Sequence, residues 1–183
     1  MNAKQPAVDP LKLTGALLAG WYLCACASNP NFGHFIDGVD LLIHEAGHWI
    51  FIFFGEFMHI LGGSLLQVLM PIIFVGYFFL RREYYSTGLM MSWVGYTIIM
   101  VAGYMNDAIV MRLPLLGGDN SIHDWNVLFV MTNQLSNTYR IAHVFLGIGW
   151  IVMICGIVCC LWFSLSKPFR SAILARFARV HES

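Results

Sequence analysis

The stretch that decides the fold runs from Val39 to Leu80 and reads VDLLIHEAGHWIFIFFGEFMHILGGSLLQVLMPIIFVGYFFL. It contains no Lys or Arg, and its acidic residues are Asp40, Glu45 and Glu56. A membrane-spanning helix needs about 20 mainly apolar residues, so this stretch is roughly two spans long. Small residues interrupt it, and the chain is expected to turn there.

The rest of the chain has the same apolar character. Of its 183 residues, 58% are hydrophobic and 11% are charged, and the mean hydropathy is +0.70. An ordinary soluble domain is about 25% charged. The composition therefore excludes a water-soluble enzyme and indicates a polytopic membrane protein in a lipid bilayer. A formal net charge of 0, with no basic stripe in the first 160 residues, argues against a nucleic-acid partner.

Four segments are apolar enough to cross the bilayer, and we expect an all-α membrane protein with residues 1–166 as a single transmembrane domain. The four crossings are Leu13–Ser28, Ser64–Leu80, Thr87–Met105 and Ile141–Leu165. Residues 106–140 form the one long polar excursion, which we expect to be an outer loop with a short helix.

Positive charges predict the orientation of these helices. Arg81 and Arg82 mark one cytoplasmic turn, and residues 167–183 carry four more Lys and Arg residues, whereas residues 29–40 carry none. We therefore expect both termini in the cytoplasm, in an architecture that suits a bacterial inner membrane. The tail 167–183 has apolar residues at helical spacing among its basic ones, which predicts an interfacial amphipathic helix, with a disordered basic tail as the alternative.

This orientation allows the opening stretch only one net crossing. Val39 to Phe54 is then a re-entrant helix that dips into the membrane from the outer side and returns through Gly55 to Gly63. Ser64–Leu80 crosses, with a kink expected near Pro71. Irregular backbone at that depth has to border protein or a watery cavity, and a cavity is what a functional site requires.

The five cysteines all lie in apolar runs, so we interpret them as buried free thiols. Leu23-Cys24-Ala25-Cys26 resembles a lipoprotein cleavage box, but we expect the first segment to remain as an anchor.

The chemistry is expected at His44-Glu45-Ala46-Gly47-His48, which has the HExxH pattern of zinc metalloproteases. On a helix, residues four apart share a face, so His44 and His48 can bind one ion while Glu45 takes a proton from water. Chance gives roughly 0.005 matches to this pattern in such a composition. Two other interpretations stay open: histidines that only hydrogen-bond within a helix bundle, and histidines that ligate haem.

The motif in its apolar setting resembles the site-2 protease class of intramembrane zinc metalloproteases, which cleave transmembrane segments of other proteins. Residues 53–57 and 61–64, with Gln67 and Pro71, are also similar to small bacterial membrane proteins that carry the same HEAGH motif. The first resemblance implies Zn²⁺, with Glu45 as the catalytic residue and a third ligand from an Asp in a later helix.

The chain lacks the Asn-Pro-Leu-Asp-Gly-like motif that supplies this Asp in site-2 proteases, so the third ligand has to come from elsewhere. The sources on the expected outer face are Asn106-Asp107, His123-Asp124 and His143. We rank Asp107 first for its family-like position, His123 second and His143 third. The alternative for each is a polar residue at the membrane interface.

Supporting residues are expected near the motif. Asp40 lies four residues before His44 and could accept a proton from its free ring nitrogen, while Asp37 or Asp40 could instead cap the helix. Glu56 and His59 are additional site residues or polar lining of the bend. Gly62 and Gly63 are expected to permit close packing.

Three functions follow from this pattern. The leading hypothesis is a membrane-embedded zinc metallopeptidase that hydrolyses a peptide bond of a transmembrane peptide at or within the membrane. The second is a non-catalytic metal-binding subunit of a larger membrane protein complex. The third is a haem- or copper-binding electron-transfer subunit.

Overall fold

The computed structural model describes residues 7–29, 33–113 and 122–171, and the secondary structure in these ranges is helical. Short 3₁₀ turns occur at Ile52–Phe54 and Leu135–Asn137, and an isolated bridge pairs Val8 with Leu165. The helices are α1 (Pro10–Ser28), α2 (Phe35–Phe51), α3 (Glu56–Leu80), α4 (Tyr84–Asn106), α5 (Asp124–Met131) and α6 (Thr138–Ser164).

Four of these helices, α1, α3, α4 and α6, are long and apolar enough to cross a membrane, which confirms the predicted all-α membrane fold. Each of the four begins before its predicted span, and a polar side chain caps the start of α1. Asp9 accepts hydrogen bonds from the backbone N–H groups of Leu11 and Lys12 at 3.2 Å, and Pro10 suits the first helical position.

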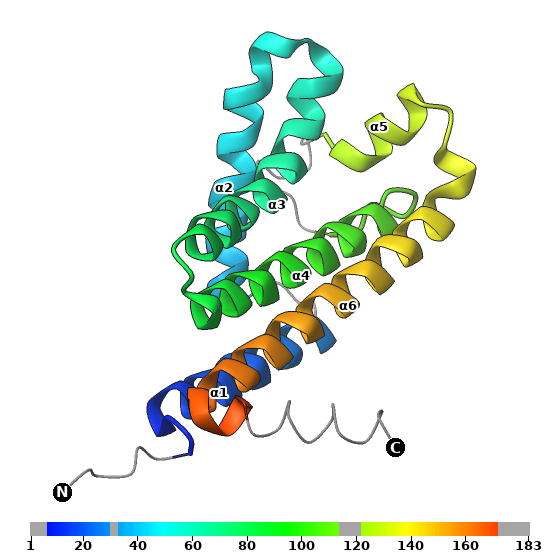
Figure 1. The fold of residues 1–183 in the computed structure, drawn as a ribbon. Coiled ribbons are helices and arrows are strands. Elements are labelled where there is room, and N and C mark those ends of the chain that lie inside the picture. Colours follow the sequence, from blue (N-terminus) through cyan, green and yellow to red (C-terminus); the bar gives the residue numbers. More distant parts are fainter. Residues whose placement is uncertain (1–6, 30–32, 114–121, 172–183) are drawn as a thin grey trace, which may run out of the picture.

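Helix α4 lies at the centre of the bundle and packs along α6, with α1 and α3 on its other sides (Figure 1). Glycines seven residues apart form the contact: Gly88 and Gly95 on α4 lie against Gly149 and Gly156 on α6. A Cβ atom on Gly95 would lie 2.2 Å from the backbone nitrogen of Met153. Such close backbone packing is typical of membrane helices, whose outer faces carry large apolar side chains toward lipid.

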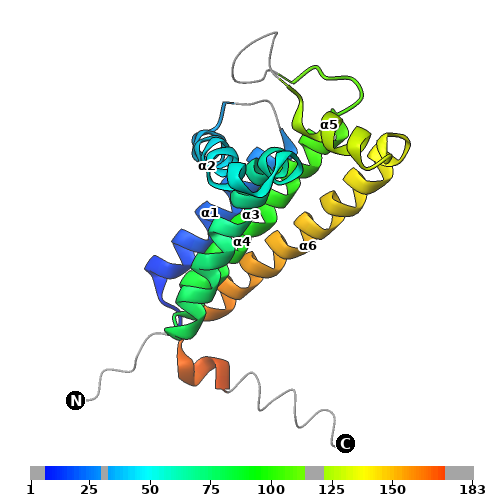
Figure 2. The same ribbon diagram turned by 90° about the horizontal axis from the view of Figure 1, so that it is seen from above.

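Helices α2 and α3 form an antiparallel hairpin whose axis lies at a steep angle to α4 and α6 (Figure 1). In the view from above, α2 is seen nearly end-on, whereas α4 and α6 are seen lengthwise (Figure 2). Helix α3 contains Pro71 and changes direction along its length, so that its second half follows α4 (Figure 1). The hairpin therefore projects sideways from the bundle.

The return between α2 and α3 is shorter than the sequence predicts. It is confined to Ile52–Phe54 and Gly55, whose φ of 90° lies in the region that favours glycine. Gly62 and Gly63, expected within the return, lie inside α3. One glycine in this conformation suffices to reverse the chain, and α3 then continues as one helix from Glu56.

Two further predictions concern the loop and the tail. Helix α5 is the short helix expected in the polar excursion. The predicted tail helix lies mostly outside the described residues, and the part that is described, residues 167–171, is helical. The re-entrant placement of α2 in the bilayer stays a prediction.

Candidate metal centre

Helix α2 presents the HExxH motif on one face. It begins after His34, where Asp37 accepts hydrogen bonds from the His34 backbone N–H at 3.1 Å and from its Nδ1 at 2.9 Å. Of the two residues proposed to cap this helix, Asp37 is the one that does so. One and two turns beyond Asp40, the imidazoles of His44 and His48 lie on the side of α2 that faces α3 and α5.

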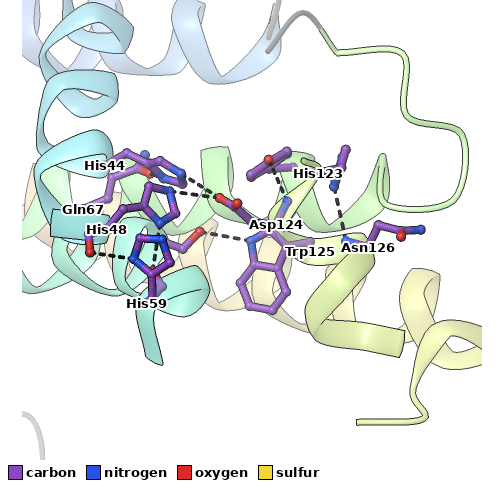
Figure 3. A network of polar contacts seen from close by, with 10 residues as sticks. His44, His48, His59, Gln67, His123, Asp124, Trp125 and Asn126 are labelled. Carbon is purple, nitrogen blue, oxygen red and sulfur yellow. Dashed lines mark hydrogen bonds and ion pairs between the residues drawn. The ribbon is translucent and has the colours of Figure 1, made fainter. Parts of the chain in front are cut away.

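The two imidazoles meet the carboxylate of Asp124, which begins α5. The Nε2 atoms of His44 and His48 lie 3.0 Å and 3.3 Å from Asp124 Oδ2. In Figure 3 both rings point at this carboxylate from the side of α2. One ligand atom from each of the three residues lies within 4.8 Å of the others. The fold thus brings together side chains that are 80 residues apart in sequence.

The second nitrogen of each ring, Nδ1, makes a hydrogen bond to an oxygen atom. His44 Nδ1 lies 3.2 Å from Gln67 Oε1, and His48 Nδ1 lies 2.8 Å from the backbone carbonyl oxygen of His59. His59 Nδ1 in turn lies 2.9 Å from the carbonyl oxygen of His48. Because these oxygens only accept, each Nδ1 donates, so Nε2 is the atom that each ring turns toward Asp124. A protonated ring donates a hydrogen bond from Nε2 to the carboxylate, and a neutral ring offers the Nε2 lone pair to a cation.

When both rings are neutral, their two Nε2 lone pairs and the carboxylate converge where a cation would satisfy all three. In a tetrahedral zinc site with bonds near 2.0 to 2.1 Å, neighbouring ligand atoms are about 3.3 Å apart. The separations of 3.0 Å and 3.3 Å match this edge length. The His44, His48 and Asp124 cluster can hold a metal ion.

Asp124 is held in place by neighbours on α3 and α4. Its backbone N–H donates to the Tyr104 hydroxyl at 3.1 Å, and the next residue, Trp125, donates its indole N–H to Ser64 Oγ at 3.0 Å. Burial alone would raise the pKa of the Asp124 carboxyl, but the two imidazoles that face it hold this pKa below its ordinary value. The carboxylate thus stays ionised and available to a cation.

The residues ranked from the sequence as third ligands lie elsewhere. Asp107 accepts from the backbone N–H groups of Arg112 and Leu113 at 3.1 Å and 2.9 Å, and its Oδ2 lies 3.5 Å from His123 Nε2. Burial lowers the pKa of His123, whose Nδ1 accepts from the backbone N–H of Asn126 and caps α5. The Asp107 and His123 pair does not join the group of His44, His48 and Asp124.

His143 also stays apart. It is exposed on α6, and its Nδ1 bonds to the Tyr139 carbonyl oxygen at 2.6 Å. The third residue of the cluster is Asp124, which the sequence places beside His123 but which is not among the three ranked ligands. One feature of the sequence favours Asp124 as a ligand. It directly follows His123, a residue able to cap a helix, and capping fixes the start of a helix in place.

Glycines allow α2 and α3 to approach closely at the cluster. A Cβ atom on Gly47 would lie 2.2 Å from the Gly62 carbonyl oxygen. A Cβ atom on Gly63 would lie 2.5 Å from His44 Nε2 and 2.6 Å from His48 Nε2. Close packing, as expected for Gly62 and Gly63, is thus their role, and Gly63 leaves the space that the two imidazoles occupy.

The cluster borders a cavity of about 510 Å³, within the usual range of ligand pockets. Glu45, Glu56 and His59 line it together with His44 and Asp124. Asp40 lines it as well, but it does not contact His44 as expected. Its Oδ1 accepts from the Trp93 indole N–H at 2.9 Å, and Gln67 takes the place predicted for it beside His44.

Comparison with known proteins gives no match: no family model, no curated protein and no solved structure is similar to this chain. The chemical interpretation of the site therefore rests on its own geometry.

Proposed function

We propose that the protein is a membrane-embedded zinc metallopeptidase that hydrolyses a peptide bond at or within the membrane. The observation that carries this proposal is the convergence of two imidazole Nε2 atoms and a carboxylate on one point of a cavity that Glu45 also lines. Two imidazoles and one carboxylate are the ligand set of several zinc peptidases, and they leave a fourth position open. The resemblance of the motif to the site-2 protease class agrees with this proposal.

Each side chain has a defined task in such a reaction. A zinc ion bound by His44, His48 and Asp124 would lower the pKa of a water molecule to near 7 and polarise a substrate carbonyl. Glu45 takes the proton from the attacking water and passes it to the departing amine nitrogen. The Tyr104 hydroxyl, which accepts from Asp124, keeps its own hydrogen to donate to the substrate carbonyl oxygen as negative charge develops.

We further propose that the end of the bundle opposite the cluster lies in the cytoplasm. Lys12, Arg81 and Lys167 lie at that end, where the Tyr85 hydroxyl donates to the Lys12 carbonyl oxygen and Asp9 N–H donates to the Ser164 carbonyl oxygen. Positive charge favours the cytoplasmic side of an inner membrane, so both termini would be cytoplasmic and the site would open near the outer face.

Reporter fusions test this orientation. A green fluorescent protein joined after Ser183 should fluoresce in bacterial cells, and alkaline phosphatase at the same position should be inactive. Phosphatase joined after Asn133 in the α5–α6 loop should be active, because that loop would be outside. The reverse pattern of activities would refute the orientation and move the site to the cytoplasmic face.

The substitution Glu45→Gln tests catalysis. It preserves the shape of the side chain and removes the proton acceptor, so we expect about one zinc per chain to remain while hydrolysis falls by at least about a hundredfold. The measurement is cleavage of a transmembrane peptide library by the zinc-loaded protein in liposomes, analysed by mass spectrometry. Glu56→Gln is the matched control, because Glu56 lines the same cavity but is exposed.

If zinc binds and Glu45→Gln equals the wild type in every assay, the catalytic proposal is wrong. A non-catalytic metal-binding subunit of a larger complex would then be the better account. Haem is less suited to the geometry, because the His44 and His48 Nε2 atoms approach the same point from one helix face rather than from opposite sides of a ring.

A further inference from the structure

The cavity beside the cluster is strongly acidic. Five carboxylates line it, and no Lys or Arg is among the described residues that do so. A divalent metal ion at the cluster would offset only part of this charge. The carboxylates belong to Asp37, Asp40, Glu45, Glu56 and Asp124.

Most of these carboxylates already have partners or a task. Asp37 accepts from the Tyr96 hydroxyl and from His34, and Asp124 faces the two imidazoles. Glu45 is the proposed proton acceptor, and Glu56 is exposed. Asp40 is the carboxylate without a task so far, and it is only 2% exposed.

Asp40 is fixed but incompletely satisfied. Trp93 donates to its Oδ1 and Gln67 of α3 lies close to the same carboxyl, while its Oδ2 is buried and makes no hydrogen bond to the described residues. A buried carboxylate oxygen without a donor is costly, so such an oxygen at a cavity wall indicates that a donor arrives from outside the chain. The surrounding carboxylates favour a donor that is positively charged.

We propose that Asp40 binds an organic cation of the substrate, an ammonium or guanidinium group close to the peptide bond that is cleaved. This inference rests on the proposed function and names its substrate class. Asp40 and His44 are one helical turn apart, about 6 Å along α2, so the cation and the scissile carbonyl belong to the same or neighbouring amino-acid residues. The cation is either the N-terminal amine of a peptide or the side chain of a Lys or Arg.

Three small probes distinguish these sources and need no catalysis. Leucinamide carries a free α-amine, Nα-acetyl-leucinamide is its neutral counterpart, and Nα-acetyl-lysinamide carries only a side-chain amine. Their dissociation constants are measured by ligand-observed NMR with the full chain in lipid nanodiscs at about pH 8, which lies above the pKa of about 7 to which burial raises the Asp40 carboxyl. We expect at least one cationic probe to bind about tenfold more tightly than the neutral one.

Variants assign the preference to Asp40. Asp40→Asn keeps an oxygen for Trp93 and should abolish the preference, whereas Glu56→Gln, which removes a charge from the exposed part of the same cavity, should leave most of it. Trp93→Phe keeps the charge of Asp40 but removes the hydrogen bond that fixes its carboxylate, so it should weaken the preference for cationic probes. This variant provides the test if Asp40→Asn does not fold. Melting temperature reports folding of each variant.

Equal binding of all three probes to the wild type would overturn the proposal, as would a preference that survives both Asp40→Asn and Trp93→Phe. A stronger leucinamide signal assigns the site to an N-terminal amine, and a stronger lysinamide signal assigns it to a side chain. The titrations are run with zinc and after chelation. Because the preference does not need the metal and the Glu45→Gln test does, each proposal can fail without the other.

Discussion

At the scale of single residues, the orientation of two imidazoles determines the site. His44 and His48 would be ordinary helical histidines if their Nδ1 atoms were free, because either nitrogen could then face Asp124. Gln67 and the His59 carbonyl oxygen bind the Nδ1 atoms and leave Nε2 for a ligand. The Gln67 contact is the more vulnerable of the two, since it depends on one side chain of α3.

Gln67→Ala should therefore weaken zinc binding without removing a ligand. Loss of such a supporting hydrogen bond lowers metal affinity by about 10- to 100-fold. The measurement is competition with a fluorescent zinc chelator in detergent solution, and Gln134→Ala, in the exposed turn before α6, is the control. Equal affinities of Gln67→Ala and the wild type would show that His44 does not need this partner.

The sequence predicts the residues of the motif well and their partners poorly. His44, His48 and Glu45 follow from a local pattern, because helical spacing alone puts the two histidines on one face. Asp124, Gln67 and Trp93 reach the site from other helices, and no local pattern encodes such contacts. Asp107 was preferred over Asp124 by likeness to a family, yet its oxygens are occupied by the backbone of the residues that follow it.

At the scale of elements, the hairpin of α2 and α3 depends on glycines where the two helices touch. Gly47 lies against Gly62 and Gly63, and the imidazoles occupy the space beside Gly63. The sequence predicts the crossings because hydropathy and length suffice for that. The predicted end of the return between α2 and α3 is wrong. Glycine pairs occur both in turns and in tight helix contacts, and only the position of the neighbouring helix distinguishes the two.

Gly63→Ala tests this packing. Its Cβ would lie 2.5 Å and 2.6 Å from the two Nε2 atoms, closer than the 3.4 Å at which ordinary van der Waals contact begins, so the rings must move. The zinc content should then fall below about half of the wild-type value. Gly76→Ala on the same helix meets nothing within 4 Å and should bind zinc normally, with up to about 1 kcal/mol of gained helix stability. Zinc content and melting temperature of both variants decide the matter, and normal zinc binding by Gly63→Ala would contradict the account.

At the scale of the whole molecule, the site is assembled from parts that the sequence keeps far apart. Helix α4, which packs along α6, contacts α3 of the hairpin and α5, and the side chains of Tyr104 on α4 and Ser64 on α3 hold α5 against both helices. Low overall charge makes the exceptions informative. The buried carboxylates of the described residues, Asp37, Asp40 and Asp124, all line one cavity, which is where a membrane protein would carry out polar chemistry.

The most direct test of the central claim is the zinc content of the purified protein, measured by inductively coupled plasma mass spectrometry. The wild type should hold about one zinc per chain. His44→Ala and Asp124→Ala should each lose most of it, whereas Asp107→Ala, which removes the neighbouring carboxylate outside the cluster, should keep it. Unchanged zinc in His44→Ala, or zinc lost from Asp107→Ala but kept by Asp124→Ala, would contradict the metal centre described here.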